Sequence, residues 1–488
     1  MEIAMADVAE FCFSDRLSDD PIDVGWSDWL HIIGWPPGFD DMNWNSTAAT
    51  SDEYFHAGSS SETLEHWSSS ISDAAISSSV GTPVEDPPKP PCIGEIDKGV
   101  RLIHLLSAAG EALSHYNNGQ QLARVILARL KQLLTPATGV VSNGTVRLVS
   151  HFTNALFRLV DAEGKELPLS ETIHCYATEV ASAMQLLQDM SPYLNFGYFT
   201  ANQAILEAVV GERRVHVVDF DIGEGAQWAP LIQALVSTRG SSPAPSHLRI
   251  TAVTRGRKSA ASTVVKETGR RLAAFAASVG LPFSFAQCRL DREECFRPEA
   301  MRLMHGEPIV FNCAIHQPHH LHHAPKSVES FLAGAAKMGA RLVTVMEEEK
   351  GGEAANEGRF FGRFMEEVQR YSAMWDALEA GFPQQGMVRE TVENVVFVPR
   401  IISAVEMAFF QREETPAAGF AEKMVVAGFR GLALSYFNLL QAKLMLGLFN
   451  EGYHIDEAEP NKLVLCWKSR PLVSASIWSC LQPPPPQP

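Results

Sequence analysis

The sequence predicts an α/β protein: a doubly wound parallel sheet with an N-terminal helical cap, preceded by a disordered tail. From residue 214 to residue 346, short apolar runs alternate with helical patterns, which is typical of parallel strands covered by helices on both faces. Two later apolar runs, 463–467 and 472–478, flank a short polar turn and predict a C-terminal antiparallel hairpin. Hydrophobic residues make up 46% of the chain, which is enough for a sizeable core.

Residues 1–94 predict the disordered, acidic tail. They are rich in Ser, Asp, Gly and Pro, and they hold 17 of the 57 acidic residues but two of the 40 basic ones. The rest of the chain is therefore nearly neutral, which argues against tight DNA binding by this chain alone. The tail carries five of the nine tryptophans, a composition typical of activation segments, with a solvating tail and incidental aromatics as the alternative. These tryptophans are Trp26, Trp29, Trp35, Trp44 and Trp67, and a second, Pro-rich tail is predicted at 481–488.

Residues 97–210 predict the helical cap, which begins with a leucine-rich hairpin of two helices. Apolar residues recur at helical spacing up to Leu113, a break follows at 117–119, and a second stripe runs on to Leu134. Most of these side chains are expected to pack on neighbouring helices. Those that protrude would offer a dimerisation face. The candidate partner-binding residues are Leu102, Leu105, Leu106, Leu113, Leu122, Ile126 and Leu130.

The core is predicted at 211–480, and its first strand, 214–220, ends in a glycine turn. The turn resembles the D-x-G-x-G-x-G turn that holds S-adenosylmethionine in methyltransferases, and Asp221, Gly223 and Gly225 would border a pocket there. The third glycine position holds Gln227, however, and the next strand ends without a carboxylate for ribose hydroxyls. We therefore expect a Rossmann/methyltransferase-like fold that is no enzyme and binds no cofactor. A methyltransferase and a non-catalytic small-molecule-binding module stay as alternatives.

A histidine-rich loop follows the strand predicted at 309–313. His316 and His319 would border the same pocket, but the loop itself offers no Asp or Glu, so we expect no metal site. The eight cysteines are scattered without a Cys-x-x-Cys pair, which indicates a reducing compartment. No apolar run is long enough to cross a membrane, and the N-terminus lacks a signal-peptide pattern. We therefore expect a soluble, intracellular protein.

The order of several motifs across 97–480 resembles the GRAS family of plant transcription regulators. The leucine-rich region comes first, then SPYLNFGYFTANQAILEAV at 191–209, and then a close match to the family's V-H-I-I-D motif. Matches to the P-F-Y-R-E and S-A-W regions follow, although the expected proline is absent from 350–358. The signature residues, which we expect to be mainly structural, are Val215, His216, Val217, Val218, Asp219, Gln227, Trp228, Arg389, Glu390, Trp467 and Trp478.

The resemblance implies a nuclear regulator that works through protein partners. The wording D-F-D-I-G-E-G-x-Q-W and the strand around Asn312 resemble family members that act in nodulation and mycorrhizal signalling and in control of strigolactone biosynthesis genes. Implied with it is a heterodimer, through the first leucine-rich region, with a related GRAS protein of the nodulation signaling pathway 1 type. That partner would contact promoter DNA, so this chain would reach DNA mostly indirectly. A homodimer is the alternative.

Overall fold

The structure is a computed structural model in which the α/β core and most of the cap are described. The expectations for the two tails, for His316 and for His319 lie outside the described residues. None of the helices in the described part of the chain is long and apolar enough to cross a membrane. The described residues are 93–115, 119–135, 143–161, 177–237, 245–254, 259–301, 303–304, 306–314, 325–349, 360–381, 386–410 and 420–481.

Among these residues, the strands form one nine-stranded sheet with the order β3-β2-β1-β4-β5-β9-β8-β7, and β6 pairs with β9. The five parallel strands each begin after a loop and are apolar along most of their length, as expected for strands covered on both faces. In spatial order they are β3 (Phe283–Arg289), β2 (His247–Thr254), β1 (Arg214–Phe220), β4 (Ile309–Ala314) and β5 (Leu342–Glu348). The strand order reverses between β1 and β4, which is the place where ligands bind in such sheets.

The C-terminal part of the sheet is antiparallel. The predicted hairpin is confirmed as β8 (Lys462–Trp467) and β9 (Arg470–Cys480), and β9 pairs antiparallel with β5. Two further strands, β6 (Phe429–Gly431) and β7 (Tyr453–Glu459), were not predicted. The sequence of β7, YHIDEAE, is acidic because the strand lies exposed at the edge of the sheet, where charges are common.

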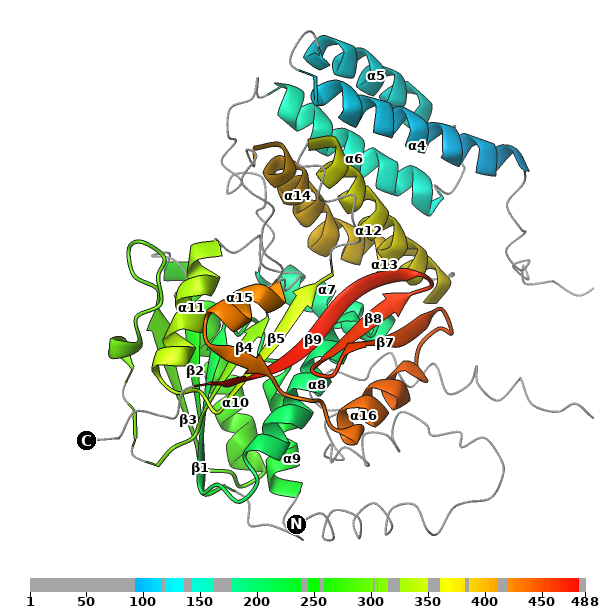
Figure 1. Cartoon of the computed structure of the whole chain (residues 1–488). Helices are drawn as coiled ribbons and strands as arrows, with labels where there is room; N and C mark the ends of the chain where they lie inside the picture. Colours follow the sequence, from blue (N-terminus) through cyan, green and yellow to red (C-terminus); the bar gives the residue numbers. More distant parts are fainter. Residues whose placement is uncertain are drawn as a thin grey trace, which may run out of the picture.

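Helices cover both faces of the parallel strands, so the doubly wound architecture is confirmed (Figure 1). On one face, α8 (Tyr193–Ala208), α9 (Trp228–Ser237) and α10 (Ser259–Ser278) share a core with the strands. On the other face, α11 (Pro325–Lys337) and α15 (Phe420–Val426) do the same. Alternate residues of each strand point to opposite faces, so β1 supplies Val217 to the first core and Val218 to the second.

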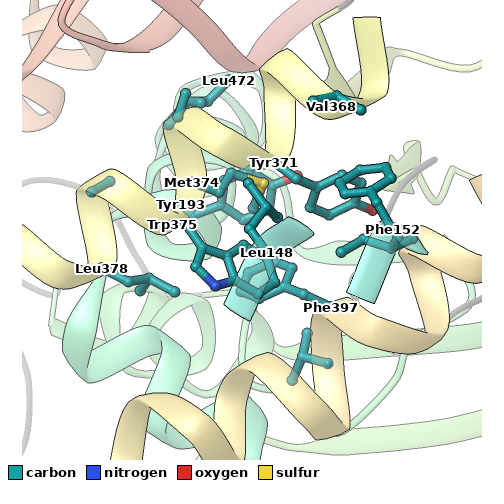
Figure 2. Packing of buried hydrophobic residues seen from close by; sticks show 14 of the residues in the cluster. Leu148, Phe152, Tyr193, Val368, Tyr371, Met374, Trp375, Leu378, Phe397 and Leu472 are labelled. Carbon is teal, nitrogen blue, oxygen red and sulfur yellow. The ribbon is translucent and has the colours of Figure 1, made fainter. Parts of the chain in front are cut away.

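The cap is built from two separate stretches of chain (Figure 1). The first stretch contains α4 (Ile93–Leu113), α5 (Gly119–Leu134), α6 (Gly144–Asp161) and α7 (Ala177–Met190). The second contains α12 (Phe360–Gly381), α13 (Gly386–Val392), the π-helix η6 (Glu393–Phe397) and α14 (Val398–Phe410). Figure 2 shows their shared core, where Leu148 of α6, Trp375 of α12 and Phe397 of η6 belong to one cluster.

The cap helices come from both predicted stretches, 97–210 and 211–480. From the second stretch, α12 packs on α4 and α6, and α14 packs on α6, while α8 of the first stretch packs on β5 and β9. The chain between 420 and 446 is helical in two separate pieces: α15 ends, Gly428 turns the chain at φ 90°, and β6 precedes α16 (Tyr436–Leu446). Among the described residues between β3 and β4, a short 3-10 helix forms at Pro298–Ala300.

A buried ion network joins cap and core. Glu348, the last residue of β5, accepts hydrogen bonds from Arg370 of α12, from Arg400 of α14 and, at 2.5 Å, from the hydroxyl of Tyr193 in α8. The side chains of Arg400 and Glu348 are 3% and 6% exposed, so their charges have lost most of their contact with water. Both charges are matched within the network, which is the condition under which buried charges are tolerated.

Candidate functional site

The glycine turn after β1 lies at the switch point of the sheet and adopts left-handed backbone angles. The φ angles of Asp221, Gly223 and Gly225 are 62°, 54° and 78°, a region that glycine enters without steric cost and that aspartate tolerates. Gly225 has a second constraint, because a Cβ atom there would lie 2.8 Å from Cγ2 of Thr268. The absence of a side chain at Gly225 therefore lets α10 approach the turn closely.

Helix α10 covers the turn through polar contacts as well as close packing. The Thr268 hydroxyl donates to the carbonyl oxygen of Gly223 at 3.0 Å, and Arg271 pairs with Glu224 at 2.6 Å. Of the three residues expected to border a pocket, Asp221 and Gly225 are buried and Gly223 is half-buried. The backbone that would face a ligand in a methyltransferase thus contacts α10 here.

A buried polar network fills the space beside the turn. Both carboxylate oxygens of Asp219 accept hydrogen bonds: Oδ1 from Nδ2 of Asn312 at 2.7 Å, and Oδ2 from Nε1 of Trp228 at 2.8 Å. Asn312, in β4, also accepts a hydrogen bond from the Thr344 hydroxyl of β5 at 2.7 Å. The network therefore connects three neighbouring parallel strands with the first turn of α9, and its groups satisfy one another.

Gln227 takes part in this network at the position where methyltransferases carry their third glycine. Its amide exchanges hydrogen bonds with the amide of Asn312, at 3.1 and 3.2 Å, and its carbonyl oxygen accepts one from Asn202 of α8 at 2.8 Å. The side chain thus binds β4 while its backbone binds α8. The residue that the sequence marks as a departure from the cofactor motif is part of the packing between core layers.

The electrostatics of Asp219 reflect a competition between burial and hydrogen bonding. Burial raises the pKa of Asp219 to about 7, although the hydrogen bonds from Asn312 and Trp228 oppose the rise. Asp221 adds a smaller contribution in the same direction as burial. A carboxyl group with a pKa near neutrality is a feature of many active sites, but both of its oxygens are bonded to this chain's own side chains.

His216 belongs to a second buried cluster at the opposite ends of the strands. Its Nε2 lies 2.8 Å from the Thr251 hydroxyl, and its Nδ1 lies 3.6 Å from a carboxylate oxygen of Glu307, which also pairs with Arg249 at 3.2 Å. Burial, with the charge of Arg249, lowers the pKa of His216 to about 3. His216 is therefore a neutral hydrogen-bonding group within the sheet.

The remaining signature residues are mostly buried anchors. Trp467 donates from its indole nitrogen to Asp376 of α12 at 2.7 Å, and Trp478 donates to the Ser476 hydroxyl at 2.9 Å. Arg389 is 7% exposed, whereas its neighbour Glu390 is exposed to solvent. Val215, Val217 and Val218 are fully buried in the two cores of the sheet.

The leucine-rich hairpin is formed by α4 and α5, but most of its candidate residues face inward. Leu102, Leu106 and Leu130 are at most 1% exposed, so these three support the cap and are not free to contact a partner. Leu105, Leu113 and Ile126 are half-buried and pack against the same core. Leu122 is 55% exposed, and Val125, which the sequence did not single out, is 68% exposed. The expected partner surface is thereby reduced to one face of α5.

Sequence reasoning also missed Asn202, Asn312 and Thr344 in the buried network. A signal for Asn312 was present, because it is a polar residue in the middle of the apolar strand IVFNCA. Such a residue needs hydrogen-bond partners when it is buried. No comparable signal identifies Asn202, which lies in a helix whose mixed sequence, YLNFGYFTANQAILEA, is buried on most sides.

Comparison with known proteins assigns the chain to a family. The model of the GRAS domain family matches residues 102–479. The chain is 47% identical to Protein NODULATION SIGNALING PATHWAY 2 of Medicago truncatula, over 80% of this chain and 78% of the relative. It is 48% identical to the protein of the same name from Lotus japonicus, over 78% and 77% of the two chains.

A third relative and a solved structure agree with this assignment. Scarecrow-like protein 26 of Arabidopsis thaliana is 46% identical over 79% of each chain. The crystal structure of SCL7 in Oryza sativa superposes with a TM-score of 0.62 at 27% identity, covering 77% of this chain and 99% of that one. The chain belongs to the GRAS domain family.

Proposed function

We propose that this chain is a nuclear transcriptional co-regulator that acts through a heterodimer with a related GRAS protein. Its processes are symbiotic signalling, in nodulation and mycorrhiza, and the control of strigolactone biosynthesis genes. Two relatives at 47% and 48% identity carry the name NODULATION SIGNALING PATHWAY 2, which supports the signalling role. The partner is a GRAS protein of the nodulation signaling pathway 1 type, which contacts promoter DNA on behalf of the pair.

The observation that carries the proposal is the outer face of α5. Leu122 and Val125, one turn apart on the same helix face, are 55% and 68% exposed, so together they form an apolar patch open to solvent. The helix, GQQLARVILARLKQLL, holds three basic residues and no acidic one, so the apolar pair lies in a positively charged surface. Figure 1 shows α5 on the outside of the cap, away from the sheet. An acidic partner surface with apolar residues would fit this face.

Regulation is favoured over catalysis by the hydrogen bonds of the switch point. The carboxylate of Asp219 and the amides of Asn312 and Gln227 bond one another, and α10 packs on the glycine turn. A methyltransferase needs these backbone and side-chain groups to face its cofactor. A heterodimer through α5 needs only the exposed face that carries Leu122 and Val125, and it leaves the switch point unchanged.

The test is a binding titration with the GRAS partner. Leu122→Glu and Val125→Glu place a carboxylate in the apolar centre of the proposed interface, and we expect each to weaken the heterodimer about tenfold or more. The full-length variants should unfold at the same denaturant concentration as the wild type, because both side chains are exposed. Unchanged affinity in a folded Leu122→Glu protein would reject the α5 face as the interface.

Two controls define the surface. Leu444→Glu makes the same change at a leucine of α16 that is 39% exposed, and we expect it to leave the heterodimer intact. A mobility-shift titration with a promoter fragment tests the indirect contact with DNA: the isolated chain should bind weakly and the heterodimer tightly. Tight, sequence-specific binding by the isolated chain would contradict the co-regulator role.

A further inference from the structure

A groove of about 460 Å³ opens between the cap and the C-terminal hairpin, apart from the switch point and from the outer face of α5. Four elements border it: α4, α6, α12 and the turn between β8 and β9. A groove of this volume is within the range of ligand pockets and holds several large side chains. Figure 1 places α12 between α6 and the hairpin, which is where the groove runs.

The floor of the groove is apolar. Leu148 of α6 and Val368 and Trp375 of α12 line it at 5%, 5% and 2% exposure, so the floor offers a small contact area, and Figure 2 shows these three in the same cluster. Ile103 of α4, at 37% exposure, forms part of the rim. The indole nitrogen of Trp375 is buried and has no hydrogen-bond acceptor among the residues that the structure describes. An amphipathic helix with an apolar face is the kind of ligand that such a floor accepts.

The wall formed by the hairpin turn is rigid and basic. Lys468 has a φ of 51°, which is costly for a residue with a long side chain, and its ammonium group lies 2.6 Å from Asp376. The other acidic residue of the groove, Glu379, pairs with Arg147 at 3.0 Å. Arg470 donates to the neutral amide of Gln369 at 2.6 Å, so its positive charge is available to an incoming carboxylate.

One segment of the N-terminal tail has a sequence that matches this groove. In 20–37, DPIDVGWSDWLHIIGWPP, apolar residues at positions 22, 26, 29, 30 and 33 share one face of a helix, and acidic residues lie beside that face. Asp20 with Pro21 is a helix start signal, and Gly34 with Pro36 is a stop signal. The spacing is the i, i+3, i+4, i+7 pattern by which helices anchor in grooves.

We propose that the segment 21–33 of this chain docks in the groove as an amphipathic helix. Trp26, Trp29 and Leu30 face the floor and the rim at Ile103, and the acidic residues face Arg470. The inference is independent of the proposed heterodimer, because it uses a different surface. Docking covers Ile103 and places the remaining tail beside the cap.

The length of the tail permits docking within one chain. Residues 34–92 connect the segment to α4, and this number of residues is enough to reach about 40 Å. Ile103 lies ten residues into α4, and ten helical residues cover about 15 Å. Tethering therefore raises the effective concentration of the segment at the groove, so that a weak contact is sufficient.

The test is photo-cross-linking in the full-length protein. The photoreactive amino acid p-benzoylphenylalanine replaces Ser372, an exposed residue that lines the groove, and cross-linked peptides are identified by mass spectrometry. A mixture of isotope-labelled and unlabelled chains distinguishes contacts within one chain from contacts between chains. We expect cross-links to 21–33 within one chain. Placing the same reagent at Gln121, on the exposed side of α5, should give none to that segment.

Matched tail variants test the specificity of the contact. Leu30→Asp should lower the cross-link yield about tenfold, because it places a charge on the apolar face. Leu64→Asp, elsewhere in the tail, should leave the yield unchanged. Cross-links from Ser372 to another segment, cross-links between chains, or no cross-link to the tail would each overturn the proposal. Thermal unfolding of both variants should match the wild type, which shows that a change in yield does not come from unfolding of the domain.

Discussion

The switch point of the sheet and the groove beside α12 differ in whether their polar groups are already bonded within the chain. At the switch point, Asp219, Asn312 and Gln227 bond one another, and α10 closes over the glycine turn. At the groove beside α12, the floor is apolar and a basic wall faces solvent. The first region has the backbone of a cofactor site with its polar groups already paired. The second has no such motif but keeps its surface exposed.

A glycine turn that resembles a cofactor motif can therefore be closed to ligands, while a surface without any motif can be open to them. The turn needs a glycine at 225 because α10 approaches within contact distance, and the same requirement holds whether or not a ligand binds. Fold-level likeness to an enzyme therefore carries no activity by itself. In the described part of this chain, the exposed pair Leu122 and Val125 lies on the cap, apart from the turn.

The largest expected effect comes from weakening the buried ion network that joins the cap to the core. Glu348→Gln removes the charge that Arg370 and Arg400 share, and breaking a buried ion pair costs about 3–5 kcal/mol. We expect a loss of that size in the free energy of unfolding, measured by denaturant titration. Glu457→Gln, in an ion pair whose side chains are both 57% exposed, is the control and should change little. A loss under 1 kcal/mol for Glu348→Gln would show that the network is dispensable.

A smaller effect is expected from opening the switch point itself. Asn312→Ala leaves Asp219, Gln227 and Thr344 without a shared partner, and each unsatisfied buried group costs about 1–3 kcal/mol. We expect the free energy of unfolding to fall by about 2–4 kcal/mol, since water entering the gap compensates in part. Asn154→Ala, at an exposed asparagine of α6, is the matched control. Equal stability of both variants would mean that the network does not hold this region closed.

The pH dependence of the free energy of unfolding tests the second buried cluster, which contains His216. The pKa of His216 is lowered to about 3 in the folded protein from an ordinary value of 6.5. Its contribution to stability is therefore present above pH 6.5 and is lost as the pH falls toward 3, by up to about 1.4 kcal/mol per pH unit. His216→Gln should lose less stability between pH 6.5 and pH 4 than the wild type does. The control is His104→Gln, on the exposed side of α4, whose stability should vary with pH as that of the wild type does. If the stability of all three proteins varied with pH in parallel, His216 would not be the group that causes the loss.

The smallest expected signal is the heat of binding S-adenosylmethionine. If the hydrogen-bonded network and α10 close the switch point, calorimetry with the full-length protein will show no saturable binding at micromolar concentrations. Saturable binding would break the comparison, because the turn would then have to open for the cofactor. Gly225→Ala distinguishes a closed turn from one that binds the cofactor. Its φ of 78° makes the substitution destabilising in both cases, but heat of binding would be lost only if the turn were a ligand site.

Much of the fold follows from the sequence because its signals are local. The alternation of apolar strands and helical patterns is enough to place β1 to β5 and the C-terminal hairpin. The grouping of helices into cap and core does not follow from the sequence, because periodicity identifies a helix without saying which helix it packs on. The apolar stripe of α12 fits a sheet or a helix equally well, and only the folded chain places it against α4 and α6.

The candidate sites were less predictable, because exposure depends on neighbours that are distant in the sequence. Leu122 and Leu130 both belong to the leucine pattern of α5, yet the first is 55% exposed and the second is buried. The same holds for Gln227, which reads as a missing glycine until Asn312, 85 residues later, is seen to be its partner. Lys468 reads as an ordinary turn residue, and its left-handed backbone is visible only in the structure.

The two-part cap has a consequence for how the protein is made. Helices α4 to α6 leave the ribosome first, but α12 and α14, which cover them, end at Phe410. At about 5–20 residues per second, roughly 10–40 s separate the synthesis of the two stretches. During that interval Leu102, Leu106 and Phe152 lack part of the packing that the finished cap supplies. The nascent chain thus exposes an apolar, leucine-rich surface. We expect chaperones to bind this surface until α12 and α14 have been synthesised.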